Sequence, residues 1–415
     1  MIGSHQGSEE QGLLSFLATR ESDIIDFARE LIATPSVNPP GDERRVAELV
    51  SDRLRKLGVT DVQLVAKDPS RPNVIARVPG TDSGPRLILC GHLDTKPPGD
   101  LDLWNSDPFD PMLRDGRLVG LGSGDMKAAV AAMVYAAGAL IAAGGSRGDV
   151  ILVLTADEEA GSNFGSRWLA QTGLLQAEAA LIGEPSGITH EWEGIHIVSR
   201  GAALFKIKVH GTQMHSSVSD RLPAINATVQ MARLIDRFDR ELKSSLTYRG
   251  HPFGGLGPTV NVGVTAKAGV FYGVYPGYAE FGCDIRTLPG MEESEVRSDV
   301  EAFLQRAMRD QPSLDADLAW EIWVPATEIA PEHAAVQSIR TAARDVLGKD
   351  VPLTAFPGAT DAAPIQLVAG IPTVAAFGPG LLPAAHSPNE SLEVSGLLKA
   401  AKIYALTSWR FSMLN

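Results

Sequence analysis

The chain has 415 residues, of which 44% are hydrophobic and 21% charged, so it can bury the cores of two ordinary domains. Its formal net charge of −13 argues against a nucleic acid or an anionic membrane as partner, because both attract basic surfaces. The two cysteines, Cys90 and Cys283, form no CxxC pair, and so low a cysteine content favours reduced thiols and a cytoplasmic location.

Two segments could be mistaken for targeting signals. The first ten residues are polar and lack the apolar core of a signal peptide, so we expect a disordered leader there. The most apolar stretch, residues 128–143, is rich in Ala, slightly short for a membrane span, and preceded by Asp125 and Lys127. We therefore interpret it as a helix buried against a sheet.

Apolar strand-like runs alternate with helical patterns in the first half of the chain, which predicts a mostly parallel sheet covered by helices. The expected strands span residues 73–78, 86–90, 150–155 and 179–182. The expected helices span residues 44–57, 126–143 and 162–170.

The middle of the chain has the content of a small α+β domain, and the α/β pattern resumes near Glu332. We therefore predict an α/β fold in which residues 11–198 and 310–415 form a split catalytic domain and residues 199–309 an inserted lid. The middle strands are expected at residues 203–209, 259–266 and 279–286, with helices at 224–242 and 293–308. The last part is expected to hold a helix ending at 347, a strand at 372–377 and a final helix from Ser391.

Several acids and histidines directly follow expected strands, where open α/β sheets bind their ligands. His92 follows the strand expected at 86–90, and Asp94 is placed to orient its ring by a hydrogen bond. A polar turn would explain this pair equally well. Three glycines lead into Asp125 at a helix start, where helix capping is the alternative and a metal-bridging carboxylate needs a tight, exposed loop.

Two further strands also deliver acids to the same edge. Adjacent residues of an extended segment point in opposite directions, so Glu159 can bind a metal while Glu158 faces the substrate. We interpret Asp157 as part of an ordinary acidic loop. Glu184 and His386 follow later strands, and the other lone histidines fit structural roles: His190, His196, His210, His251 and His333.

Together, two histidines and several carboxylates at strand ends are what a zinc pair with nitrogen and oxygen ligands requires. A shared Asp would hold the two metals roughly 3.5–4 Å apart. Cobalt or manganese would suit the same ligands.

The sequence resembles the M20 metallopeptidases, which include acetylornithine deacetylase, succinyl-diaminopimelate desuccinylase, aminoacylase-1 and glutamate carboxypeptidase. The resemblance runs in order through nearly the whole chain. It rests on the motifs TPSVNPP at 34–40, GHLD at 91–94, Trp104 with DPF at 107–109, GLGSGDMK at 120–127, DEE at 157–159, GEPS at 183–186, GTQMHS at 211–216, DIR at 284–286, GATD at 358–361 and His386.

The resemblance implies two zinc ions per chain and a role for each motif residue. His92 and Glu184 would bind one zinc, Glu159 and His386 the other, and Asp125 both, with a cis peptide bond after Asp125. Glu158 would be the general base, Asp94 would support His92, His215 would act on the partner subunit of a homodimer, and Arg286 would hold a substrate carboxylate. For His215 a polar turn residue is the alternative, and for Arg286 a strand arginine in a salt bridge.

The implied function is hydrolysis of the amide bond of an N-acyl amino acid or a related small substrate with a free carboxylate. A dipeptidase or carboxypeptidase of the same family would use the same machinery. A catalytically inactive binding homologue would lack a ligand or Glu158, yet all are present. An unrelated two-zinc aminopeptidase leaves the inserted domain and Arg286 unexplained. Departures from the family pattern at residues 219–227 and 271–276 concern substrate recognition.

Overall fold

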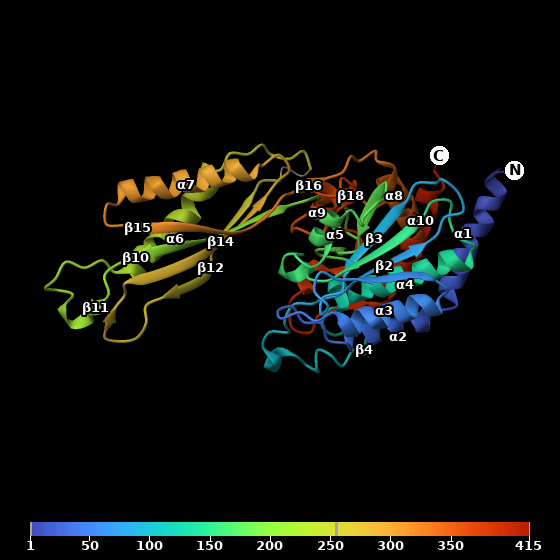
Figure 1. Ribbon diagram of the computed structural model, residues 1–415, viewed down its shortest axis with the longest axis horizontal. Coiled ribbons are helices and arrows are strands. Elements are labelled where there is room, and N and C mark those ends of the chain that lie inside the picture. Colours follow the sequence, from blue (N-terminus) through green and yellow to red (C-terminus); the bar gives the residue numbers. More distant parts are fainter. Residues whose placement is uncertain (1, 254–255, 415) are drawn as a thin grey trace. The chain divides into compact units, whose positions relative to one another are not determined.

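The computed structural model describes residues 2–253 and 256–414, and the chain forms two compact units. The first unit contains the residues up to Val198, Glu328–Phe356, and the chain from Thr360 onward. The second contains Ser199–Thr327 and Pro357–Ala359. Figure 1 shows the elements of both.

A six-stranded sheet forms the centre of the first unit and confirms the predicted α/β class. Strands β6, β3, β7 and β18 are parallel neighbours in that order, and β2 and β1 extend the β6 edge in antiparallel fashion. The strands are β1 (Asp61–Val65), β2 (Asn73–Val78), β3 (Leu87–His92), β6 (Val150–Thr155), β7 (Ala179–Ile182) and β18 (Thr373–Val374).

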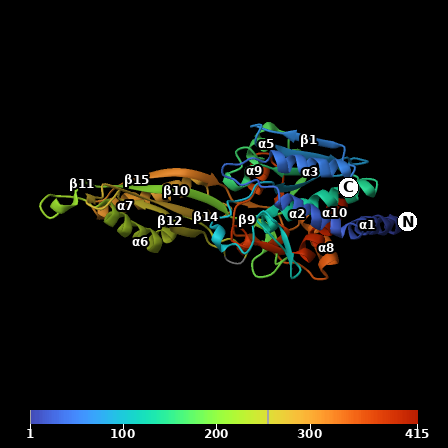
Figure 2. The same ribbon diagram turned by 90° about the horizontal axis from the view of Figure 1, so that it is seen from below.

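Helices cover both faces of this sheet. Successive side chains of β3 point to opposite faces, and since both sets are apolar, each face needs a layer of helices. Ile88 and Cys90 of β3 pack in a cluster with residues of α5 and α9. On the other face, α4 packs against α1, α2, α3 and α10. Figure 2 shows α1, α2 and α10 of this layer. The helices are α1 (Ile2–Ala18), α2 (Glu21–Ile32), α3 (Arg44–Lys56), α4 (Ala128–Ala142), α5 (Ser166–Thr172), α8 (Ala334–Leu347), α9 (Ala362–Leu367) and α10 (Val394–Ser412).

Two expectations about single segments can be compared with the structure. The segment 123–142 is the one helix among the described residues that is long and apolar enough to cross a membrane, and 89% of its most apolar window is buried inside the protein. This confirms the buried helix expected at 128–143. The disordered leader expected over the first ten residues is wrong, because α1 begins at Ile2 and the carboxylate of Glu10 pairs with Arg410 at 2.8 Å.

Short strands and turns complete the first unit. The final helix begins at Val394, three residues later than expected, because Ser391–Glu393 pairs with Arg117–Val119. These elements are β4 (Met112–Arg114), β5 (Arg117–Val119), β8 (Pro185–Gly187), β9 (Ile195–Ser199), β16 (Thr327–Glu328), β17 (Leu353–Phe356), β19 (Gly378–Leu381) and β20 (Ser391–Glu393), with helical turns η1 (Leu101–Leu103), η2 (Ser123–Lys127), η3 (Glu158–Ala160) and η5 (Leu382–Ala384).

The second unit is an antiparallel sheet of order β12-β14-β10-β15 packed against α6 and α7. Its core contains Phe205, Phe238, Phe281 and Phe303. The elements are β10 (Gly201–His210), β11 (Met214–His215), η4 (Ser216–Val218), α6 (Ala227–Ser245), β12 (Thr259–Ala268), β13 (Val274–Tyr275), β14 (Tyr278–Thr287), α7 (Glu293–Asp310) and β15 (Asp315–Val324).

The second unit begins at Ser199, as the inserted domain was expected to, but it ends at Thr327 and not near residue 309. The physical reason is strand β15, which follows α7 and pairs along β10, so it belongs to the second sheet. The register runs from Ala202 opposite Val324 to His210 opposite Asp315.

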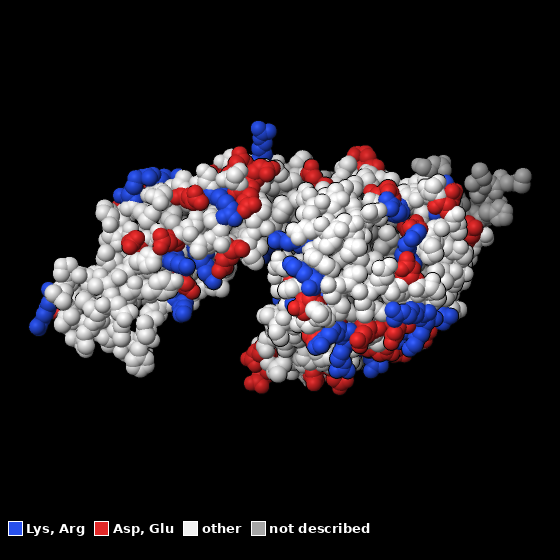
Figure 3. Space-filling model, viewed as in Figure 1, with Lys and Arg blue, Asp and Glu red and all other residues white. Residues whose placement is uncertain are grey.

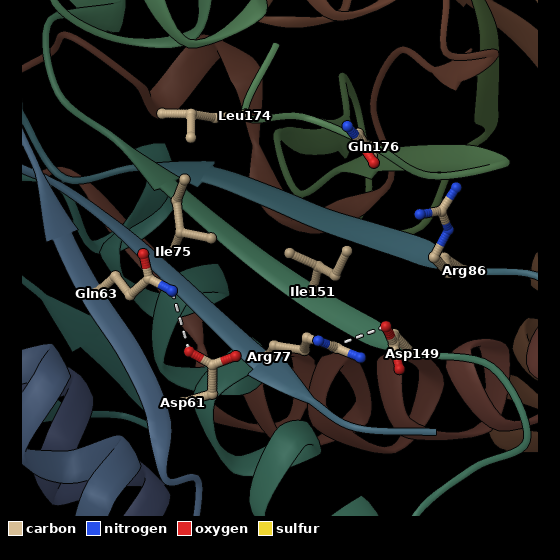
Figure 4. Close-up of a pocket in the computed structure, with 9 residues that line it drawn as sticks. All are labelled: Asp61, Gln63, Ile75, Arg77, Arg86, Asp149, Ile151, Leu174 and Gln176. Atoms are coloured by element: carbon tan, nitrogen blue, oxygen red, sulfur yellow. Dashed lines mark hydrogen bonds and ion pairs between the residues drawn. The ribbon is translucent and has the colours of Figure 1, made fainter. Parts of the chain in front are cut away.

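The amino-terminal ends of β3 and β6 and the carboxyl-terminal half of the antiparallel β2 border a cavity of about 320 Å³ in the first unit (Figure 4). Its two arginines are paired, Arg77 with Asp149 at 2.7 Å and Arg86 with Glu178 at 2.9 Å. On the face seen in Figure 3, the acidic and basic side chains of the first unit are likewise interspersed. The acids and histidines singled out in the sequence lie at the opposite, carboxyl-terminal ends of the strands.

Candidate metal centre

Three neighbouring parallel strands deliver the candidate residues to one edge of the sheet. His92 is the last residue of β3, which lies between β6 and β7. Glu158 and Glu159 follow β6, and Glu184 follows β7. Because parallel strands end on the same side, these side chains converge although up to 92 residues separate them in the chain.

Two groups of potential metal ligands share one carboxylate. In the first group, His92 Nε2 lies 2.9 Å from Asp125 Oδ1 and 3.6 Å from Glu184 Oε1. In the second, His386 Nε2 lies 3.0 Å from Glu159 Oε1 and 3.2 Å from Asp125 Oδ2. The ligand atoms within each group lie within 4.8 Å of one another. The structure therefore brings together all five residues that the sequence suggested as metal ligands.

The donor set fits a pair of divalent cations. The carboxylates of Asp125, Glu159 and Glu184 are at most 7% exposed, and buried carboxylates need compensating positive charge. The same buried carboxylates affect the pKa of the histidine beside them. Burial disfavours a charged His386, yet its hydrogen bonds to Asp125 and Glu159 raise its pKa to about 10. One nitrogen and two carboxylate donors in each group match the ligands that zinc takes in hydrolases.

The ring of His92 is oriented by the main chain. Its Nδ1 donates a hydrogen bond to the main-chain oxygen of Asp94 at 2.9 Å, whereas the Asp94 carboxylate is 3.9 Å away. This bond fixes the proton on Nδ1 and leaves Nε2, which faces Asp125, free to bind a metal. The expected partner residue of His92 is thus present, but its carbonyl group makes the contact.

The carboxylate of Asp94 orients the loop that carries the two glutamates. It is fully buried and accepts hydrogen bonds from Asn38 Nδ2 at 2.8 Å and from the main-chain N–H groups of Glu158 and Glu159 at 3.2 Å each. Burial raises the pKa of Asp94 to about 6, while His92 and Asn38 oppose this shift.

Asp157 is not part of an ordinary acidic loop, so that interpretation is wrong. It is 3% exposed, has a left-handed φ of 63°, and accepts hydrogen bonds from Asn38 at 3.1 Å and Arg71 at 3.2 Å. Arg71 is itself buried and forms a two-bond ion pair with Glu43 at 2.6 and 2.7 Å. Through these buried contacts, Asp157 anchors the start of the turn that carries Glu158 and Glu159.

Glu158 has the surroundings of a general base. Among the described residues its carboxylate forms no hydrogen bond, so the group is free to exchange a proton. Burial raises its pKa, His92 lowers it, and the nearby Asp361 and Glu159 raise it further. The carboxylate of Asp361 is held in place near Glu158 by hydrogen bonds from Thr155 Oγ1 at 2.7 Å and Ser162 Oγ at 2.8 Å.

Asp125 lies in the irregular turn η2, which is fixed at both ends. Gly122 enters the turn with a left-handed φ of 80°, which favours glycine, and the Asp125–Met126 peptide bond is cis, as expected. At the far end, the buried Lys127 ammonium donates to the main-chain oxygens of Leu31 at 2.9 Å and Thr34 at 2.7 Å. The turn is therefore held in one place against α2.

Sequence reasoning missed several residues that contact these candidates. Besides Asn38 and Arg71, the half-buried Lys96 places its Nζ 3.3 Å from Glu159 Oε2. A lysine two residues after Asp94 was a usable signal, because it follows the strand that carries His92. Structural roles are seen for two histidines, since His196 contacts the Ser186 carbonyl at 3.1 Å and His333 caps α8.

His215 and Arg286 belong to the second unit, apart in the chain from every ligand. His215 ends β11, is exposed, and its Nδ1 accepts from Ser217 Oγ at 2.7 Å. Arg286 lies on β14 and pairs with Asp284 at 2.8 Å. Both alternatives considered for these residues, a turn residue and a salt-bridged strand arginine, have the contacts they require.

Comparisons with known proteins show the family of this chain. The family model described as peptidase family M20/M25/M40 matches residues 88–410. The chain belongs to this family. It is therefore an enzyme that hydrolyses amide bonds, as the sequence motifs indicated.

One relative covers nearly the whole chain and a second covers about half of it. A succinyl-diaminopimelate desuccinylase of Thioalkalivibrio sulfidiphilus is 29% identical over 92% of this chain and 97% of its own length. One of Gluconacetobacter diazotrophicus is 37% identical, over 49% of this chain and 54% of its own length.

Two solved structures share the fold. The dipeptidase Dug1p of Saccharomyces cerevisiae has a TM-score of 0.81 at 15% identity, over 98% of this chain and 99% of that one. The YXEP protein of Bacillus subtilis, described as a dinuclear metal-binding peptidase of the M20 family, has a TM-score of 0.63 at 16% identity, over 94% and 98%.

Proposed function

We propose that this chain is a two-zinc deacylase that hydrolyses the amide bond of a small N-acyl amino acid with a free carboxylate. The observation that carries the proposal is the Asp125 carboxylate, whose two oxygens face His92 at 2.9 Å and His386 at 3.2 Å in two ligand groups. A single shared carboxylate between two such groups is the arrangement that a metal pair requires.

The metal ligands divide between two ions. His92, Asp125 and Glu184 would hold one, and Asp125, Glu159 and His386 the other. When bound, such a pair lowers the pKa of water and polarises a carbonyl group. Zinc is favoured over calcium or magnesium because a histidine nitrogen stands in each group, whereas those ions prefer oxygen ligands.

Glu158 would move the proton of the reaction. Hydrolysis adds water to the amide, so one proton must leave the water and one must reach the departing amine. Glu158 is half-buried as a residue, and its carboxylate has no hydrogen-bond partner among the described residues. The raised pKa of this carboxylate favours picking up a proton. One carboxylate suffices for both transfers because the two steps are sequential.

Arg286 would bind the free carboxylate of the substrate, since its planar guanidinium group suits two parallel hydrogen bonds to a carboxylate. The bond to Asp284 leaves the Arg286 side chain 33% exposed. The two desuccinylase relatives, which by name act on an acylated amino acid, support this substrate class. A dipeptide, whose C-terminal carboxylate offers the same group, is the alternative.

A panel of substrates tests this proposal. Zinc-reconstituted protein would be assayed with N-succinyl, N-acetyl and other N-acyl amino acids, and with dipeptides that have the same carboxyl-terminal residue. We expect release of the free amino acid from at least one N-acyl substrate at a higher kcat/KM than from any dipeptide. Hydrolysis of the dipeptides alone would make the chain a dipeptidase instead.

The first unit would then be the catalytic domain, and the second a lid that also forms a homodimer. His215 lies in the second unit and every metal ligand in the first, so we infer that His215 serves the site of a partner subunit, where it would stabilise the developing oxyanion. Mixing His215→Ala chains with Glu158→Gln chains should restore activity once subunits exchange. Absence of recovery despite proven exchange would contradict a role across subunits.

We also infer a cytoplasmic location. Both cysteines are free and buried, Cys90 in the first unit and Cys283 in the second, so neither stabilises the fold as a disulfide. Cell fractionation tests this inference, and recovery of the native enzyme from a membrane or secreted fraction would contradict it.

A further inference from the structure

Glu390 connects two segments that carry metal ligands. It lies four residues after His386, directly before strand β20, and is 1% exposed. Strand β20 pairs with β5, with Ser391 opposite Val119. Since β5 leads directly into the glycine-rich segment that ends at Asp125, this strand pair brings the two ligand segments together.

Four main-chain N–H groups of the glycine-rich segment donate to Glu390. Its main-chain oxygen accepts from Gly120 at 2.9 Å. In the side chain, Oε2 accepts from Gly122 at 3.0 Å, and Oε1 accepts from Gly124 at 2.7 Å and from Asp125 at 2.9 Å. A buried carboxylate that accepts several main-chain hydrogen bonds holds the donating segment firmly, because bonds to a charged acceptor are the stronger kind.

The last of these bonds acts directly on the shared ligand. It fixes the main chain of Asp125, whose two carboxylate oxygens face His92 and His386. Any shift of this turn would move Asp125 relative to both histidines at once.

The turn that carries His386 is anchored from a second direction. Asn389 donates from its Nδ2 to the main-chain oxygen of Leu103 at 2.9 Å and accepts from the main-chain N–H of Asn105 at 2.7 Å. His386 and Asn389 both have left-handed φ angles, 58° and 62°. Such a turn needs contacts like these to keep its shape.

We propose that Glu390 is a positioning residue of the metal centre, which presets Asp125 and couples its place to the His386 segment. The inference rests on the two-metal centre proposed above and goes beyond it, since Glu390 belongs to neither ligand group. Residues that orient metal ligands commonly change metal affinity about 10- to 100-fold when they are replaced.

Metal affinity of full-length, metal-stripped protein tests the proposal. Zn²⁺ would be titrated against a chromophoric chelator for the wild type, Glu390→Gln and the control Glu393→Gln, which removes an exposed acid from the end of the same strand. The Gln variant keeps the size of the side chain but turns one acceptor into a donor that faces a main-chain N–H group. Hydrogen exchange of residues 120–127 in the metal-free proteins gives a second readout.

We expect Glu390→Gln to weaken binding of both ions about 10- to 100-fold and to speed exchange in residues 120–127, with no change in Glu393→Gln. If Glu390→Gln does not fold, Glu390→Asp is measured instead, and its shortened carboxylate should give a smaller loss in the same direction. If the Glu390 variant that folds binds both ions as tightly as the wild type, the positioning role of Glu390 is overturned. The proposed function is not affected by that result. A wild type that binds fewer than two ions overturns the proposed function together with the positioning role.

Discussion

Replacing Glu158 by Gln separates the proton-transferring group from the metal ligands. The substitution keeps the size of the side chain and removes its ability to take up a proton. Because the Glu158 carboxylate forms no hydrogen bond with the described residues, the substitution breaks no hydrogen bond to them. It also removes one negative charge near Glu159, Asp125 and Asp361, which all raise the pKa of Glu158.

The expected magnitudes follow from these facts. Loss of a general acid–base group lowers turnover about 10²- to 10⁴-fold, which corresponds to about 3–5 kcal/mol of transition-state stabilisation. Metal content should stay at the wild-type value, because the neighbouring ligand Glu159 is unchanged. The Tm should move by less than about 2 °C, since no buried group loses a partner.

The assay combines steady-state kinetics on the best substrate of the panel with elemental analysis and thermal melting of the same preparation. A Glu158→Gln enzyme with more than about a tenth of wild-type kcat would refute the assignment of Glu158 as the base. A variant that loses metal along with activity would show that Glu158 is a ligand instead.

Three further predictions follow from the same contacts. Glu159→Gln should lower metal content toward one ion per chain, because it alters the contacts of Glu159 to His386 and Lys96; a fully loaded variant would exclude Glu159 as a ligand. In a denaturant titration, Arg71→Met should lower the free energy of unfolding by about 3–5 kcal/mol, since it leaves Glu43 and Asp157 buried without their cation. The control is Arg44→Met, which removes an exposed ion pair with Asp42 and should lower the same free energy by at most about 1 kcal/mol. Chelation should abolish activity, and Zn²⁺ should restore it; activity that survives verified metal removal would exclude a metal-dependent reaction.

The elements that could be predicted from the sequence are those with local signals. The bounds of the strand at 150–155 were predicted correctly because a continuous apolar run lies there between Asp149 and the acids that begin at Asp157. The five ligands could be predicted because each follows an apolar strand or a glycine-rich turn, and parallel strands bring their carboxyl ends to one edge. The ordered motifs of a known family then gave each ligand a role.

The features that could not be predicted depend on contacts between distant residues. Strand β15 joins the second sheet by pairing with β10, more than 100 residues earlier, and no local pattern at residues 315–324 signals that pairing. The sequence around Asp157 is typical of a solvated acid, and only the structure shows that Arg71 and Asn38 bind its carboxylate. Glu390 is one acid near the end of the chain, and its importance appears only when its four N–H donors are located.

The most direct test of the two-metal centre is the anomalous scattering of a zinc-reconstituted crystal, measured at the zinc absorption edge. We predict two peaks per chain, roughly 3.5–4 Å apart, one beside His92 and Glu184 and the other beside Glu159 and His386, with Asp125 between them. A single peak, or no peak at these residues in an enzyme shown to be active, would contradict the account.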